Sequence, residues 1–382
     1  MSNYSMVQSD QALKEFDSKW KVVGFEELLE DVSSGNKKLK KSDYQEIGEL
    51  PVVDQGKDLI AGYTKKEDAV EASPPYIVFG DHTRIFKEVD FKMALGADGV
   101  KLLKIKDEFE GECYYKFLFY FFQTLNIPDT GYNRHFKYLK NVKIPLPSLS
   151  EQKAIVAKLD RAQRLIDIDR EMLAKYDELI QSVFLEMFGD PVRNEKGWEV
   201  KKLGNVGTLA RGKSKHRPRN DPSILGGEYP LIQTGDVANA GLFITEYSST
   251  YNEAGLKQSK LWDNGTLCIT IAANIAKVGI LDFDACFPDS VVGFKSEKAS
   301  SIFIYAWMGF LQNIIEEQAP VSAQKNINLR ILNDLDIIFP PLSLQREYEQ
   351  IVLKVDRERK EIENLNQKSE ELFSSLVQEA FG

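Results

Sequence analysis

The sequence predicts an α+β protein in which two globular domains in tandem repeat are separated by two long α-helices packed as an antiparallel coiled coil. The stretches 149–189 and 342–382 carry apolar residues at alternating steps of three and four, which is the period of a helix packed lengthwise on another helix. The two stretches also share sequence, since IVAKLD at 155–160 matches IVLKVD at 351–356. We therefore interpret them as two copies of one long helix.

The first long helix is predicted to begin after Pro147, where Ser148 and Glu151 form a capping box, and to end at Gly189, which precedes Asp-Pro. Its contact face is expected to contain Ile155, Leu159, Ala162, Ile166, Leu173, Tyr176, Ile180, Val183 and Met187, with one polar interruption at Asp169. The corresponding face of the second helix is expected to contain Ile351, Val355, Ile362, Leu365, Leu372 and Leu376.

The duplication extends over the globular parts. Trp20-Lys-Val opens the first half and Trp198-Glu-Val the second, and LPVVDQG at 50–56 parallels YPLIQTG at 229–235. One unit of about 190 residues is thus used twice. The predicted divisions are a first globular domain at 1–148 with an N-terminal extension at 1–18, a first helix at 149–189, a second globular domain at 190–341 and a second helix at 342–382.

Each globular domain alternates short β-rich runs with Gly, Asp and Asn turns, which favours a mainly antiparallel sheet. Strands are expected at 51–53, 76–79, 100–105, 231–233, 266–271 and 291–294. One helix is expected near the end of each domain, at 112–125 and 301–318. The aromatic residues of the first of these helices are interpreted as core packing before a base-stacking platform.

Composition excludes several classes of protein. The 382 residues are 43% hydrophobic and 28% charged, enough for two domains with cores of their own. Neither a run of about 18 apolar residues nor an apolar N-terminus is present, so we expect no membrane span and no signal peptide. The three cysteines and three histidines are scattered, which indicates a reducing, cytoplasmic location and no metal site.

The formal net charge of −9 argues against nucleic acid, but the distribution of charge matters more than its sum. Basic residues cluster at 37–41 and, more densely, at 211–219. A single basic run is more often a solvated loop. Two runs at matching places in two repeats favour phosphate binding instead.

Residues 207–214 fit the G-x-x-x-x-G-K-[ST] pattern of a phosphate-binding loop. That motif requires a helix directly after it, whereas His-Arg-Pro-Arg-Asn-Asp-Pro at 216–222 cannot open one. We therefore expect this segment to meet nucleic-acid phosphates rather than a nucleotide. Because no nucleophile, base and orienting group assemble, the sequence predicts a binding protein and not an enzyme.

The sequence resembles the specificity subunits of type I restriction-modification systems. The junction MFGDPVRNEKGWEV at 187–200, the segment YPLIQTGD at 229–236 and AQKNIN at 323–328 carry the resemblance. So do the Pro-Leu-Pro and Pro-Pro-Leu turns that precede the two long helices. The resemblance covers nearly the whole chain, apart from residues 1–18.

The resemblance implies that each globular domain is a target-recognition domain that reads one half of a split, asymmetric sequence in double-stranded DNA. The two helices would form the spacer and dock two methyltransferase subunits, which carry S-adenosylmethionine and flip the target adenines. Restriction motor-nuclease subunits, which use ATP, would complete the complex. This chain itself would hold no cofactor and would contact no membrane.

Candidate DNA-binding residues follow from side-chain chemistry. Phosphate contacts are expected from Lys37, Lys38, Arg211, Lys213, Lys215, Arg217 and Arg219. Base reading in the first domain is assigned to Gln55, Lys57, His82, Thr83, Arg84, Asn133 and Arg134. Base reading in the second domain is assigned to Thr234, Asp236, Asn274, Lys277, Gln324, Lys325 and Asn326. The alternative for each is a turn residue that satisfies local backbone, and His82 and His135 are expected to hydrogen-bond structurally.

A second interpretation of the whole chain remains open at this point. A coiled-coil scaffold that joins two protein-binding domains would explain the long helices and the acidity. It would leave the paired basic segments and the matching turns unexplained. Salt dependence of DNA binding separates the two interpretations, because only phosphate neutralisation releases counterions.

Overall fold

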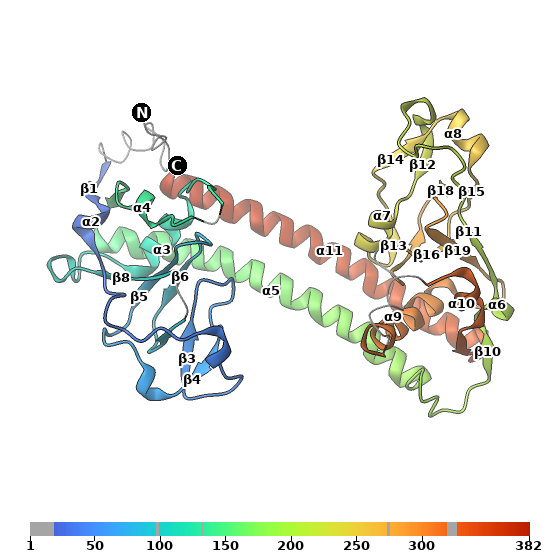
Figure 1. Cartoon of the computed structure of the whole chain (residues 1–382), viewed down its shortest axis with the longest axis horizontal. Helices are drawn as coiled ribbons and strands as arrows, with labels where there is room; N and C mark the ends of the chain where they lie inside the picture. Colours follow the sequence, from blue (N-terminus) through green and yellow to red (C-terminus); the bar gives the residue numbers. More distant parts are fainter. Residues whose placement is uncertain (1–18, 97–98, 132, 273–275, 319–326) are drawn as a thin grey trace. The chain divides into compact units, whose positions relative to one another are not determined.

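The computed structural model describes residues 19–96, 99–131, 133–272, 276–310 and 327–382, together with the backbone of 311–318. The chain divides into two compact units, Met1–Ile168 with Asn366–Gly382 and Asp169–Leu365. Each unit contains one globular domain and one segment of each long helix (Figure 1).

The two long helices are α5 (Leu149–Phe188) and α11 (Leu342–Phe381), of 40 residues each. At 1.5 Å per residue, each is about 60 Å long. The predicted capping box is confirmed, since the amide of Ser148 donates to Glu151 Oε2 at 3.0 Å and the amide of Glu151 donates to Ser148 Oγ at 3.4 Å. Gly189 ends α5 with a φ of 77°, a conformation that favours glycine.

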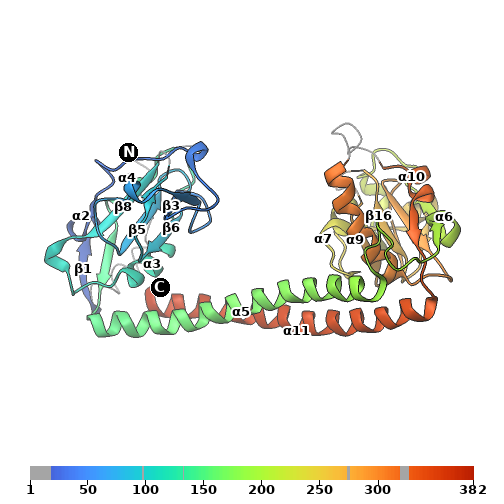
Figure 2. The same cartoon turned by 90° about the horizontal axis from the view of Figure 1, so that it is seen from below.

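The predicted antiparallel packing of these helices is confirmed (Figure 2). In the second unit, Asp177 pairs with Arg359 at 3.7 Å, and Tyr348 donates to the carbonyl of Ile180 at 3.3 Å. Rising numbers in α5 thus face falling numbers in α11. In the first unit, Lys158 pairs with Glu379 at 3.5 Å. The nine predicted contact positions of α5 are all buried or half-buried.

The predicted contact face of α11 is wrong at three positions. Ile351, Leu365 and Leu372 are 39%, 48% and 46% exposed. The least exposed side of α11 instead follows Tyr348, Val352, Val355, Ile362, Asn366, Ser369, Phe373 and Leu376. Each of the three wrong positions lies one residue before an inward one, and polarity explains the error only at Leu365, which precedes the polar inward residue Asn366.

The first globular domain is built from short strands. They are β1 (Lys21–Gly24), β2 (Leu29–Asp31), β3 (Leu50–Val53), β4 (Gly62–Thr64), β5 (Tyr76–Gly80), β6 (Phe86–Val89), β7 (Ala94–Leu95), β8 (Val100–Ile105) and β9 (Lys143–Leu146). Their orders are β2-β8-β5-β6, β4-β3-β7 and β1-β9. All these pairs are antiparallel except β3 with β7, as the sequence predicted for the domain as a whole.

Helices cover these strands. They are α2 (Phe25–Leu28), α3 (Tyr115–Gln123) and α4 (Phe136–Leu139), with 3₁₀ turns η1 (Lys41–Asp43), η2 (Lys66–Asp68) and η3 (Asp107–Phe109). The predicted helix at 112–125 is shorter than expected. It packs on β5 and β6, and Phe122 stacks on Phe86 with ring centroids 5.0 Å apart. Its aromatic residues are core residues, as predicted.

The second globular domain has two larger sheets. Its strands are β10 (Val200–Lys202), β11 (Thr208–Arg211), β12 (Leu225–Leu231), β13 (Phe243–Ile244), β14 (Ser249–Tyr251), β15 (Leu261–Trp262), β16 (Leu267–Thr270), β17 (Val278–Leu281), β18 (Ala285–Cys286), β19 (Val291–Lys295) and β20 (Asp336–Ile338). The described strands have the orders β11-β19-β16-β17-β13, β14-β12-β18-β15 and β10-β20. The pairs β12–β18 and β13–β17 are parallel. The strand predicted at 231–233 shares only Leu231 with β12, which begins six residues earlier and ends there.

The helices of the second domain are α6 (Leu203–Val206), η4 (Pro222–Ile224), α7 (Thr234–Asn239), α8 (Glu253–Gln258), α9 (Ser301–Gln318) and α10 (Leu329–Asp334). The helix predicted at 301–318 is therefore confirmed. In both domains a two-stranded pair, β1–β9 or β10–β20, joins the start of the domain to the strand before the long helix. The internal repeat is thus visible in the topology.

A buried glutamine ties each long helix to its domain. Gln152 Oε1 accepts from the amide of Tyr114 at 2.8 Å, and its Nε2 donates to Glu112 O and Pro147 O at 2.8 and 2.9 Å. Gln345 repeats the arrangement. Its Oε1 accepts from the amide of Ser300 at 3.0 Å, and its Nε2 donates to Pro340 O at 2.8 Å. Both side chains are fully buried, so these bonds are shielded from water.

Candidate nucleic-acid interface

Three loops of the first domain meet. We call residues 54–58, 81–85, 127–131 and 133–135 the loop cluster. Thr83 Oγ1 donates to Gln55 O at 2.7 Å, and the amide of His82 donates to Gln55 Oε1 at 3.3 Å. His82 Nδ1 lies 3.1 Å from Asn133 O. The fold therefore brings together predicted base-reading residues that are far apart in the sequence.

Two buried residues, Asp81 and His135, hold the loop cluster in place. His135 is fully buried, its Nδ1 lies 2.8 Å from the carbonyl oxygen of Asp81, and its amide donates to the same oxygen at 2.9 Å. Asp81 Oδ1 accepts from the amide of Phe136 at 2.7 Å. The histidine thus fixes the 81–85 turn to the start of α4, which is the structural role that the sequence analysis expected.

Lys87 is a residue that the sequence analysis missed. Its side chain is only 5% exposed, and its ammonium donates to Asp54 O at 2.8 Å and to Asp58 O. The carboxylate of Asp54 lies 3.9 Å away. Burial lowers the pKa of Lys87, and the two nearby carboxylates oppose that shift. The 54–58 loop is therefore folded around a buried cation. The available signal was a lysine that directly follows two apolar residues, Ile85 and Phe86.

The remaining predicted residues of the loop cluster differ in how they are held. Arg84 has a φ of 64°, and its guanidinium donates to Asp129 at 2.8 Å and to Ile127 O at 3.3 Å. The backbone amide of Gly131 and then Arg84 lower the pKa of Asp129. Lys57 and Arg134 are exposed. Arg84 thus shapes a loop, while Lys57 and Arg134 extend into solvent.

The two predicted phosphate-binding lysines of the first domain are in different environments. Lys37 pairs with the buried carboxylate of Asp68 at 2.5 Å, and Asp68 also accepts from Thr64 Oγ1 at 2.6 Å. The hydrogen bond from Lys37 lowers the pKa of Asp68. Lys38 is exposed, and no ion pair involves it within the described part of the chain. Lys37 is therefore already engaged, whereas Lys38 is free to meet an anion.

In the second domain, the basic segment, residues 211–219, continues from β11 at the edge of the five-stranded sheet. Exposed Arg211, Lys213 and Lys215 alternate with buried Gly212 and Ser214, so these three side chains point outward as on a strand. The chain then bends at 216–218 and turns at 219–220, where Arg217 and Arg219 are also exposed. All five predicted phosphate-binding residues of this domain are thus exposed on one segment.

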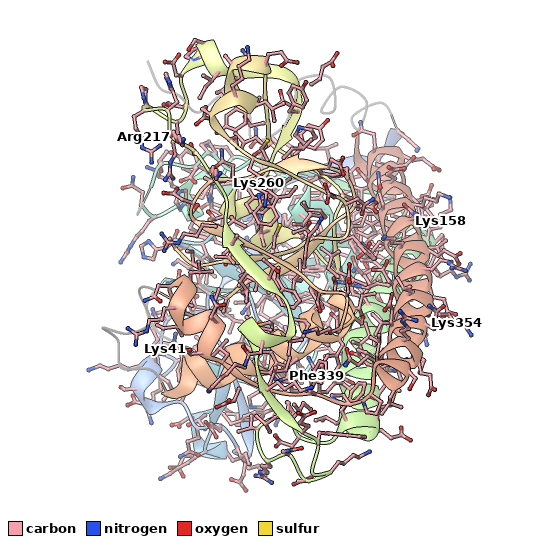
Figure 3. The ribbon with its side chains drawn as sticks, turned by 90° about the vertical axis from the view of Figure 1, so that its right-hand side faces the viewer. Lys41, Lys158, Arg217, Lys260, Phe339 and Lys354 are labelled. Carbon is pink, nitrogen blue, oxygen red and sulfur yellow. The ribbon has the colours of Figure 1, made fainter. Side chains whose placement is uncertain are left out.

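Not all five cations are equally available. Arg219 pairs with Asp289, and Arg217, at the edge of the domain in Figure 3, donates to Ser214 O at 2.5 Å. For Arg211, Lys213 and Lys215, no ion pair occurs among the residues that the structure describes. These three residues carry uncompensated charge on the basic segment, and so does Arg217, whose hydrogen bonds go to neutral carbonyl groups.

Helix α8 and an Asp–His pair hold the basic segment in place. Gln258 Oε1 accepts from the amides of Lys215 and His216 at 2.6 and 3.0 Å. His216 Nε2 lies 2.7 Å from the carboxylate of Asp221. The backbone amide of Ser223 and then His216 lower the pKa of Asp221 to about 2. These hydrogen bonds thus fix the conformation of the basic segment, which is not an unconstrained solvated loop.

The backbone geometry of the same segment excludes a nucleotide-binding phosphate loop. Thr208–Arg211 is an edge strand paired with β19, and the amide of Gly212 donates to Val291 O at 2.9 Å. After Ser214 the backbone continues without a helix to η4. A phosphate-binding loop needs a helix N-terminus at that point, so the sequence pattern is coincidental.

The predicted base-reading residues of the second domain are only partly described. Thr234 begins α7, and Asp236 accepts from the amide of Gln233 at 2.7 Å as a helix cap. Lys277 lies in the turn between β16 and β17, where its amide donates to Thr270 Oγ1 at 3.0 Å. Helix α7 packs on both strands. Asn274, Gln324, Lys325 and Asn326 lie outside the described residues.

The described residues form neither a metal site nor a membrane-spanning helix. Among the described residues, no group of three or more His, Cys, Asp and Glu side chains could hold a metal ion. Within the same residues, every helix is too short or too polar to cross a membrane. The candidate sites are therefore the loop cluster and the basic segment.

Both halves of the chain match one family model, and the chain is similar to several known proteins. The family model for the type I restriction modification DNA specificity domain matches residues 17–175 and 195–372. The putative type I restriction enzyme MjaX specificity subunit of Methanocaldococcus jannaschii is 24% identical over 260 residues, which are 63% of this chain and 59% of that protein. The EcoR124I/EcoR124II specificity subunit of Escherichia coli is 26% identical over 254 residues, 62% of this chain and 60% of that protein.

A solved structure has the same fold. The S subunit of a type I restriction-modification system from M. genitalium aligns with 95% of this chain and 96% of its own, with a TM-score of 0.58 and 16% identity. The sequence alignments with the curated relatives span less than two thirds of those proteins, 59% and 60% of their length in the two examples. The structural alignment is thus the more extensive of the two kinds of likeness.

Proposed function

The chain belongs to the type I restriction-modification DNA specificity family, and we propose that it is the subunit that selects the DNA target of such a system. Each globular domain reads one half of a bipartite, asymmetric sequence. The two long helices separate the halves and dock two methyltransferase subunits, which restriction motor-nuclease subunits join. S-adenosylmethionine and ATP belong to these partners, and this chain holds neither.

The observation that carries the proposal is the loop cluster. It supports base reading because three loops present amide, hydroxyl and cationic side chains together, and these are the groups that recognise base edges in the major groove. The loops are fixed by buried groups, so the reading surface needs little ordering when DNA binds. The basic segment of the second domain supplies backbone contacts, which set the position of the duplex without reading it.

Exposed apolar residues on the long helices support protein docking. Those on α5 are Leu165, Ile168, Met172, Leu179 and Leu185, and those on α11 are Ile351, Leu365 and Leu372. Leu165, Ile168 and Met172 follow one face of α5 at steps of three and four. Rows of this kind are typical of interaction surfaces. We assign them to the methyltransferase subunits.

The direct test is modified-base sequencing of DNA from the source cell with the gene intact and deleted. We expect one bipartite adenine-methylation motif to disappear on deletion. An insertion of about one helical turn in α5 should then lengthen the unread gap and leave both half-sites unchanged. If the half-sites themselves changed, the spacer role would be wrong.

The scaffold interpretation predicts a different set of results. Deletion would leave the methylation pattern intact, and the assembled complex would bind duplex DNA with little dependence on salt. For the proposed function, a complex that neutralises six to ten phosphates loses about 10³–10⁵ in affinity between 50 and 200 mM salt. Flat behaviour over that range would favour the scaffold.

A further inference from the structure

Three lysines gather beside the basic segment. Lys213 lies within it, Lys260 follows α8, and Lys295 ends β19. Ser259 Oγ donates to Lys213 O at 2.8 Å, so the backbone before Lys260 lies against the basic segment. Burial, followed by the charges of Lys213 and Lys295, lowers the pKa of Lys260. The ammonium group of Lys260 is therefore close enough to those of Lys213 and Lys295 to be repelled by both.

Carboxylates compensate only part of this charge. Asp263 forms an ion pair with Lys295, and that hydrogen bond lowers the pKa of Asp263. No ion pair involves Lys213 or Lys260 in the portion of the chain that the structure describes. Lys213 and Lys260 thus have no ion-pair partner of their own, and Asp263, whose charge also acts on Lys260, is shared with Lys295. An external polyanion would stabilise this arrangement.

An aromatic ring holds Lys260 in place. Its Nζ lies 3.5 Å from the centre of the Trp262 ring, a favourable distance for a cation–π interaction. The ring is buried and stacks on Phe287 at 4.9 Å with an angle of 20°. Gly293 on β19 makes room for it, since a Cβ there would lie 2.6 Å from the ring. Lys260 is therefore more ordered than an ordinary surface lysine.

We propose that Lys260, held by Trp262, and Lys213 bind backbone phosphates of duplex DNA at the second domain. This site rests on the proposed function and extends it to residues outside the basic segment. Each ammonium donates hydrogen bonds to phosphate oxygens as a point charge, so the site positions the duplex and is indifferent to sequence. Because the ring already restricts Lys260, less side-chain entropy is lost on binding.

The experiment measures binding of the assembled complex to a mixed-sequence DNA duplex as a function of salt. Lys260→Met should reduce the slope of log affinity against log salt by about one. The loss of affinity between 50 and 200 mM salt then becomes about fourfold smaller than for the unaltered complex. Lys213→Met should reduce the slope by the same amount, and the double variant should reduce it by about two. Lys260→Arg keeps the positive charge and should keep most of the original slope.

Lys257→Met is the matched control, because Lys257 is an exposed lysine on α8 three residues away. Its slope should equal that of the unaltered complex. If Lys260→Met also leaves the slope unchanged, or if Lys260→Met and Lys257→Met reduce it equally, the proposed phosphate site is wrong, although the proposed function stands. A complex with no salt-dependent duplex binding before any substitution would instead refute the proposed function. Tryptophan fluorescence of the variants verifies that the Trp262 environment is folded.

Discussion

Replacement of Lys87 by methionine tests whether a buried cation shapes the base-reading loop. Methionine fills similar space but cannot donate to Asp54 O and Asp58 O. Each hydrogen bond from a charged donor contributes about 1.5–3 kcal/mol, and the substitution removes two of them. The removal of a buried charge offsets part of this loss. We expect a net loss of about 2 kcal/mol in the free energy of unfolding of the first unit.

The functional effect should be confined to one half-site. Without the ammonium, the 54–58 loop no longer holds Gln55 against His82 and Thr83, whereas the second domain is unchanged. Cells that carry Lys87→Met should therefore lose or relax methylation specificity at the half-site of the first domain and retain the other. Modified-base sequencing measures this, and urea unfolding measures the stability.

Lys104 provides a control with the same chemistry at a different turn. Its ammonium donates to Ser73 O and Pro75 O at 2.7 and 3.2 Å, outside the loop cluster. Lys104→Met should destabilise the first unit to a similar or smaller extent and leave the recognised sequence unchanged. If both variants altered specificity equally, or if Lys87→Met left both stability and specificity intact, the positioning role of Lys87 would be refuted.

Three further predictions concern stability and reactivity. Gln152→Leu should lower the free energy of unfolding of the first unit by about 2–4 kcal/mol, because buried backbone groups lose their partners, and Gln345→Leu should do the same in the second unit; urea unfolding measures both. The pKa of Asp221 is lowered to about 2, so its contribution is complete above about pH 4 and is lost as the pH falls toward 2. Hydrogen exchange of the basic segment should accelerate over that range, and Asp221→Asn should show the fast exchange already at neutral pH. All cysteines should resist thiol reagents until the chain unfolds, because all three are buried and burial raises the pKa of Cys113 to about 12.

Periodicity was sufficient where packing repeats along one direction. The contact face of α5 and its capping box were predictable because a long helix buries every third or fourth residue and begins with a local side-chain motif. The same rule was wrong at three of the six predicted positions of α11; at one of them, polar Asn366 faces inward and its apolar neighbour Leu365 faces solvent. Burial in a coiled coil is set by the position of a residue on the helix. The polarity of a residue predicts its burial only where inward positions are apolar and outward positions are polar.

The candidate site shows the same limit. The basic segment could be predicted because its charges are contiguous in the sequence, and the structure then paired Arg219 with Asp289 and left Lys213 uncompensated. Lys87 and Lys260 could not be selected in advance. Each is an isolated lysine whose importance depends on carbonyl groups or an aromatic ring brought close by folding.

The duplicated architecture, the two long helices and the family could be predicted from the amino-acid sequence, since each depends on residue patterns that are local or repeated. Which polar side chains meet and which charges remain uncompensated became known only from the folded chain. Hydrogen bonds and ion pairs act over a few ångströms. Their partners here, such as Lys87 with Asp54, are separated by tens of residues along the chain.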